Sequence, residues 1–122
     1  MADITLLQEK AADLGRLIGQ SAEYQAVKRA GEVLNADREA VALLQQMERL
    51  QTDAQRMIQR GEQPGEEMER QLDELLGKIQ GNSLYQRMAA SEENFNKLMQ
   101  RVNEWIGEGI RKGATSSIIT LG

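Results

Sequence analysis

Acidic side chains form the densest chemical cluster in this sequence, between residues 66 and 74. The cluster consists of Glu66, Glu67, Glu69, Asp73 and Glu74. In a helix, Glu69 would share one face with Glu66 and Asp73, and such carboxylates could hold a hard cation. A solvated helix face explains the same cluster, because glutamates in a first turn suit the helix dipole and Glu66 can pair with Arg70. We favour the solvated face and predict no bound metal and no cofactor.

The side chains that most enzymes rely on are missing from the chain. None of the 122 residues is a cysteine or a histidine. Without cysteine there is no disulfide, no thiolate metal site and no cysteine nucleophile. Without histidine, the usual general base, the commonest metal ligand and the Ser-His-Asp triad are lost together. Carboxylate or lysine chemistry remains open, but we predict no catalytic residue and a protein that is not an enzyme.

Three arginines form a second candidate site on the stretch from Asp37 to Gly61. Arg49, Arg56 and Arg60 fall on one side of a predicted helix, with Asp53 among them. Such a stripe suits RNA or an acidic protein partner. It has no interleaved aromatic side chains on which bases could stack, and a net charge of −4 disfavours nucleic acid. A plain charged surface is therefore our preferred interpretation, with RNA binding as the alternative function.

The elements that position these side chains are predicted to be helices. Between Asp37 and Gly61, apolar residues recur at alternating steps of three and four, which indicates a heptad seam. The seam residues are Ala40, Leu43, Met47, Leu50, Ala54 and Met57. Asp37 is a good N-cap, and Gly61 followed by Pro64 is typical of a helix stop and restart. A second helix over 65–80 should fold back antiparallel on the first, because the connection is short.

Three further helices are predicted, over residues 3–19, 21–34 and 83 to about 112. The sequence therefore predicts an all-α protein: a bundle of about five helices built on a long antiparallel helical hairpin plus a long C-terminal helix. Residues 1–112 form a single domain in this interpretation, and residues 113–122 a flexible tail. Because Ile118, Ile119 and Leu121 are costly to leave in water, the tail could instead dock as a short apolar peptide.

Several apolar residues lie outside the seams and would remain exposed in a single chain. They are Leu44, Ile58, Met99, Trp105, Ile106 and Ile110. An elongated hairpin has a thin core, so we expect these residues to bind a partner or a second copy, giving a homodimer or a higher oligomer. The N-terminus has no signal-peptide pattern and no stretch is long and apolar enough to span a membrane. We therefore expect a cytoplasmic protein without a membrane partner.

Four blocks of the sequence resemble the YlbF/YmcA family of small helical bacterial proteins, and within it the YheA-like members. They read LGxxIxxSxxYQxxKxA from Leu14 to Ala30, LNADxEAxxLL from Leu34 to Leu44, KIQxN from Lys78 to Asn82, and AxxxxFNxLMxxVNxxI from Ala90 to Ile106. The resemblance covers roughly residues 4 to 110. It implies a cytoplasmic, self-associating regulatory adaptor.

Some members of this family act with partner proteins on RNase Y-dependent mRNA processing, and so on competence, biofilm formation and sporulation. The resemblance thus implies a bacterial regulatory or RNA-processing complex as the partner. Members linked to iron–sulfur clusters carry cysteines, which this chain lacks. We therefore do not expect an iron–sulfur cluster in this protein. The RNase Y-linked role is an expectation that rests on the resemblance alone.

Overall fold

The computed structural model describes the backbone of residues 3–121 and the side chains of residues 3–115. Within these residues the chain forms five α-helices and no strand, which confirms the all-α prediction. The helices are α1 (Ile4–Gln20), α2 (Ala22–Ala36), α3 (Arg38–Gln59), α4 (Glu66–Gly81) and α5 (Ser83–Leu121).

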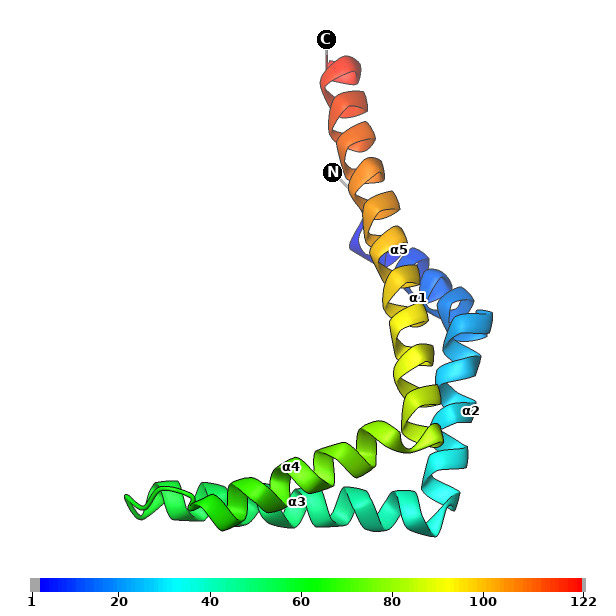
Figure 1. Ribbon diagram of the computed structural model, residues 1–122. Helices are drawn as coiled ribbons and strands as arrows, with labels where there is room; N and C mark the ends of the chain where they lie inside the picture. Colours follow the sequence, from blue (N-terminus) through cyan, green and yellow to red (C-terminus); the bar gives the residue numbers. More distant parts are fainter. Residues whose placement is uncertain (1–2, 122) are drawn as a thin grey trace.

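The molecule is L-shaped, with two arms that meet at a corner (Figure 1). One arm contains α1, α2 and α5, and the other is formed by α3 and α4, which lie side by side and run in opposite directions. The most extensive contact between helices joins α2 to α5. The sequence had suggested instead that the hairpin of α3 and α4 would be the centre to which the other helices pack.

Short polar side chains begin four of the five helices. Asp3, Ser21 and Asp37 accept hydrogen bonds from backbone N–H groups in the first turns of α1, α2 and α3. Asn82 accepts from the N–H groups of Leu84 and Tyr85 and so begins α5. These caps satisfy donors that a helix leaves unpaired, so they set the boundaries that the sequence predicted.

Glycine ends α3 in the way that its position predicts. Gly61 has a φ of +80°, a left-handed conformation that other residues rarely adopt. The Gly61 N–H donates to the Ile58 carbonyl at 3.0 Å and the Glu62 N–H to the Met57 carbonyl at 2.8 Å. This pair of bonds is a Schellman motif, which releases the chain into the turn that leads to α4.

The buried core is small, and most of its residues lie toward the corner of the L, with Val102 farther along α5. Its members within the described side chains come from α2, α3, α4 and α5: Ala30, Leu34, Ala40, Leu43, Leu75 and Val102. No residue of α1 is buried. A core of this size leaves most apolar stripes of the helices only partly covered by the single chain.

Helix α5 is longer than the sequence predicted. It continues past Lys112, the expected end, to Leu121. Gly113 did not stop it, because a glycine costs about 1 kcal/mol in a helix but removes no hydrogen bond, and no proline follows. The Thr115 hydroxyl also finds a partner within the helix, the Arg111 carbonyl at 2.9 Å. Ile118, Ile119 and Leu121, proposed as a docking tail, have side chains outside the described part, so that prediction stays open.

Candidate protein-interaction surfaces

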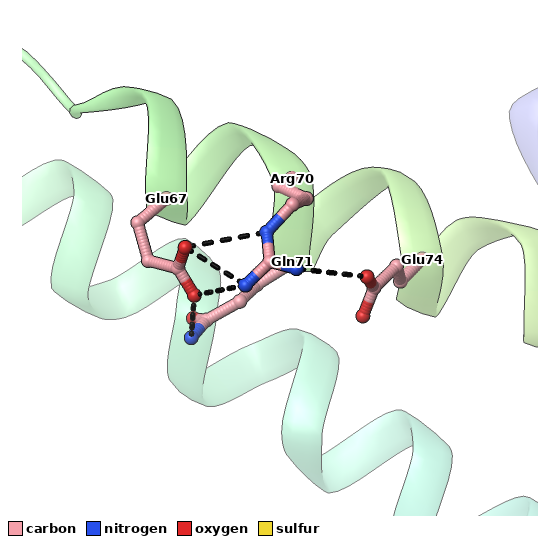
Figure 2. Close-up of polar contacts among 4 residues, drawn as sticks. All are labelled: Glu67, Arg70, Gln71 and Glu74. Atoms are coloured by element: carbon pink, nitrogen blue, oxygen red, sulfur yellow. Dashed lines mark hydrogen bonds and ion pairs between the residues drawn. The ribbon is translucent and has the colours of Figure 1, made fainter.

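Two of the five carboxylates in the acidic cluster of α4 pair with an arginine of the same helix (Figure 2). Arg70 donates to Glu67 through Nε at 3.2 Å and Nη2 at 2.6 Å, and its Nη1 lies 3.6 Å from Glu74. Gln71 also donates to Glu67. Glu67 first and then Glu74 raise the pKa of the Arg70 guanidinium above its ordinary value. The ion pairs are therefore Glu67–Arg70–Glu74 rather than the predicted Glu66–Arg70.

A metal site does not assemble around these carboxylates in the part of the chain that the structure describes. No group of three or more acidic side chains there is placed to hold an ion. All three members of the Arg70 network are exposed, so the network contributes little to stability.

The predicted arginine stripe lies on a surface of mixed charge. Arg49 and Arg56 line a shallow depression along α3 together with Glu48 and Asp53. Arg60 is the C-cap residue of the same helix, beyond the depression. Because acidic and basic side chains alternate along this face, it offers no continuous positive surface to a phosphate backbone.

Helix α1 has an apolar stripe that the chain itself does not cover. Ile4 is 78 % exposed, Leu7 60 % and Leu17 65 %. The main neighbour of α1 is α2, and this contact buries no residue of α1 completely. In proteins, most of the stability of a helix comes from packing of its apolar face. An uncovered face of this kind is a candidate surface for binding another chain.

A second uncovered apolar region lies on the distal part of α5. The orange and red part of this helix extends beyond α2, on the arm that also carries α1 (Figure 1). Trp105, Ile106 and Ile110 are exposed there, and the Arg101 guanidinium lies 5.2 Å from the centre of the Trp105 ring. We call Ile4, Leu7 and Leu17 of α1 with Trp105, Ile106 and Ile110 of α5 the arm surface.

The other residues expected at an interface are spread over the molecule. Met99 is half-buried on α5, so it is less available than Trp105 or Ile106. Ile58 is exposed near the end of α3, at the tip of the hairpin arm. Leu44 lines a groove at the corner. The sequence did not mark Ile4, Leu7 and Leu17 as interface residues, because the amphipathic pattern of their helix predicts that its apolar face is buried.

The total surface of the chain is large for its mass. It exposes 9686 Å², whereas a compact monomer of 13.7 kDa exposes about 6,600 Å². The excess of roughly 3,000 Å² is more than one subunit's share of a typical obligate dimer interface, which buries about 2,000–5,000 Å² in total. The elongated shape and the exposed apolar residues thus leave enough surface for a second chain to cover.

At the corner of the L, one hydrogen bond joins two helices that are distant in the sequence. The Tyr85 hydroxyl on α5 donates to the Ala40 carbonyl on α3 at 2.7 Å. Ala40 is 0 % exposed. Partial burial, and to a smaller extent the Glu48 carboxylate, raise the pKa of Tyr85 above its ordinary value. This bond holds the hairpin arm against the start of α5.

Replacing Tyr85 by phenylalanine should destabilise the fold by about 1 kcal/mol at neutral pH. Because the folded-state pKa of Tyr85 is raised, its stabilising contribution is complete below about pH 10, the ordinary pKa of tyrosine. It is lost as the pH rises through the folded-state pKa. Urea unfolding of both proteins should therefore show a difference at pH 7 that shrinks above pH ~10. A difference that stays constant with pH would contradict this role.

Comparison with known proteins places the chain in a family. A sequence model of the family described as "Control of competence regulator ComK, YlbF/YmcA" matches residues 7–111. Similar sequences are UPF0342 proteins. The one from Streptococcus sanguinis is 31 % identical over 94 residues, 77 % of this chain and 79 % of that protein. The one from Limosilactobacillus reuteri is 25 % identical over 105 residues, 86 % and 85 % of the two chains.

The fold is that of a solved structure, "X-ray Crystal Structure of Bacillus subtilis RicA in complex with RicF". The TM-score is 0.79 and the sequence identity is 18 %, with 92 % of this chain and 99 % of that chain covered. Among the described residues, no helix has the length and apolar character needed to cross a membrane. The family model extends from within α1 to within α5, and the chain belongs to the YlbF/YmcA family.

Proposed function

We propose that this protein is a non-catalytic adaptor of a bacterial regulatory complex and acts by binding other proteins. The single observation that carries the proposal is helix α1, whose apolar stripe has no buried residue in the single chain. The described surface offers apolar helix faces, which are the usual means by which helical proteins recognise one another.

A second copy of the chain is the first partner in this proposal. The excess surface is large enough for an obligate dimer, and the arm surface is apolar enough to drive one. The predicted homodimer or higher oligomer would bury α1, and a twofold axis would let the same residues serve both subunits.

A further regulatory protein is the second partner. The family description names control of a competence regulator, and a protein of the same fold was crystallised in a complex with another protein. By the family resemblance, we extend the proposal to RNase Y-linked mRNA processing, and so to competence, biofilm formation and sporulation, and to a cytoplasmic location. The absence of cysteine leaves no thiolate for an iron–sulfur cluster, so the adaptor would act without one.

Affinity capture from the native cell tests this proposal. Glutamate at Trp105 and Ile106 should reduce the captured regulatory protein at least about tenfold, because each change removes a buried apolar contact worth about 1.5–3 kcal/mol. Mass spectrometry identifies the captured protein, and the complex is then rebuilt from the two purified proteins. Circular dichroism at 222 nm should stay unchanged, since both residues are exposed in the single chain.

The matched control places glutamate at Asn96 and Gln100, two exposed polar positions of the same helix that lie off the face of Trp105 and Ile106. It adds the same charge without removing an apolar side chain, so capture should persist. Equal capture by the wild-type chain and the Trp105/Ile106 variant would reject the distal part of α5 as the interaction surface.

A further inference from the structure

A groove opens at the corner of the L, where four helices meet. Its volume is about 640 Å³, and it is separate from the arm surface. Its apolar lining comes from α2, α3, α4 and α5: Leu34, Leu44, Ile79, Met88 and Ala89. Because each helix contributes at least one of these side chains, the groove exists only when the two arms are joined.

One position in the wall of the groove carries no side chain. Gly31 lines it from α2, and a Cβ built there would meet only the end of the Met88 side chain, at 3.9 Å. This is an ordinary contact distance, so close packing of α2 on α5 does not require a glycine. Gly31 therefore does not mark a close helix crossing.

The lining of the groove also includes polar side chains and one negative charge. The side chains of Asn35, Gln80 and Gln86 lie along it, and Gln86 donates to the Gln80 carbonyl at 2.8 Å. Glu92 is the one charged residue among those that line the groove, and neither a lysine nor an arginine is present there. Glu48 is close enough to act electrostatically on Tyr85, which also lines the groove. An occupant with positive charge beside an apolar face would therefore be complementary.

We propose that this corner groove receives the apolar face of a basic amphipathic helix from a partner protein. The proposal deepens the proposed function, on which it rests, by giving the chemistry of the second partner. Leucine-sized side chains of that helix would enter between Leu44, Ile79 and Met88, and its lysines or arginines would face Glu92. This is the helix-in-groove mode of recognition, in which side chains one turn apart act as anchors. Helix α1 remains free to bind a second copy, and Trp105 and Ile106 remain free to contact the rest of the partner protein.

Two synthetic peptides of about 14 residues, or four helical turns, are the probes. They share one pattern of leucines and differ only in carrying lysine or glutamate at every polar position. We expect the full-length protein to bind the lysine peptide at least about tenfold more tightly than the glutamate peptide. In NMR spectra, the methyl resonances of Leu44, Ile79 and Met88 should shift on titration.

Two variants test where the peptide binds. Glu92→Lys should remove or reverse the preference between the peptides, whereas Glu93→Lys, the same change at an exposed neighbour that does not line the groove, should leave it. Gly31→Leu should fill the groove and weaken binding of the lysine peptide about tenfold or more. Gly77→Leu, on an open part of α4, is its control.

Three results would overturn the proposal. They are equal binding of both peptides, methyl shifts confined to α1 and the distal part of α5, or unchanged binding by Gly31→Leu. Saturation of the groove methyl resonances by an uncharged apolar alcohol, without binding of either peptide, would identify a small-molecule pocket instead. Peptide binding does not require the arm surface, so a monomeric protein that still binds the lysine peptide would reject self-association and leave the groove intact.

Discussion

Exchanging Leu7 and Leu17 for glutamate is expected to convert the protein from a dimer to a monomer. Both side chains are more than half exposed in the single chain, so the change should not unfold it. In the dimer, each leucine would gain about 1.5–3 kcal/mol from burial, and a buried carboxylate would add a further cost. The dissociation constant should rise by at least about 100-fold.

Light scattering at micromolar concentration measures this effect directly. The wild-type chain should have a molar mass of at least twice 13.7 kDa and the variant a mass of 13.7 kDa. A matched control places glutamate at Thr5 and Ala12, exposed positions on the side of α1 opposite Leu7 and Leu17, and should keep the wild-type mass. If both variants keep the wild-type mass, α1 lies outside the interface. A wild-type mass of 13.7 kDa would reject self-association.

The second large effect is expected from Leu75→Ala, within the small core. Leu75 is 4 % exposed on α4, and removing its side chain leaves a cavity that the few surrounding core residues cannot fill. We expect a loss of about 3 kcal/mol, within the range of 2–5 kcal/mol for such changes. This is a large part of the 5–15 kcal/mol that stabilises a typical domain.

Urea unfolding followed by circular dichroism measures this loss. The measurement is best made in the Leu7/Leu17 glutamate background, because unfolding of a dimer would depend on protein concentration. Leu76→Ala is the control: Leu76 is the next residue of α4 but is 43 % exposed, so its loss should be less than about 1 kcal/mol. Equal losses for the two variants would mean that α4 packs differently against its neighbours.

The elements of this fold could be predicted from the sequence because their signals are local. Ser21 and Asp37 are N-cap residues, and each accepts the hydrogen bond that its position predicts. Gly61 takes the left-handed conformation that ends α3. These features depend on a few neighbouring residues. The predicted end of α5 was wrong because Gly113 is only a weak stop signal, and the helix continues through it.

Apart from the short-looped hairpin of α3 and α4, the pairing of helices could not be predicted, because it depends on contacts between residues that are distant in the sequence. Tyr24 of α2 and Phe95 of α5 pack edge to face with ring centres 5.5 Å apart, although 70 residues separate them in the sequence. An apolar stripe identifies the face of a helix that seeks contact but does not identify its partner. For the same reason, the sequence did not indicate that α1 stays uncovered or that Leu44 lines a groove at the corner.

The rate of hydrogen exchange along α1 is the most direct test of the central claim, that another chain covers this helix. In the single chain α1 has no buried residue, and a helix of 17 residues is only marginally stable without packing. At micromolar concentration the wild-type protein should protect the amides of α1 as strongly as those of α2, and the Leu7/Leu17 glutamate variant should lose protection in α1 alone. Rapid exchange of α1 in the wild-type protein at every concentration would contradict the account.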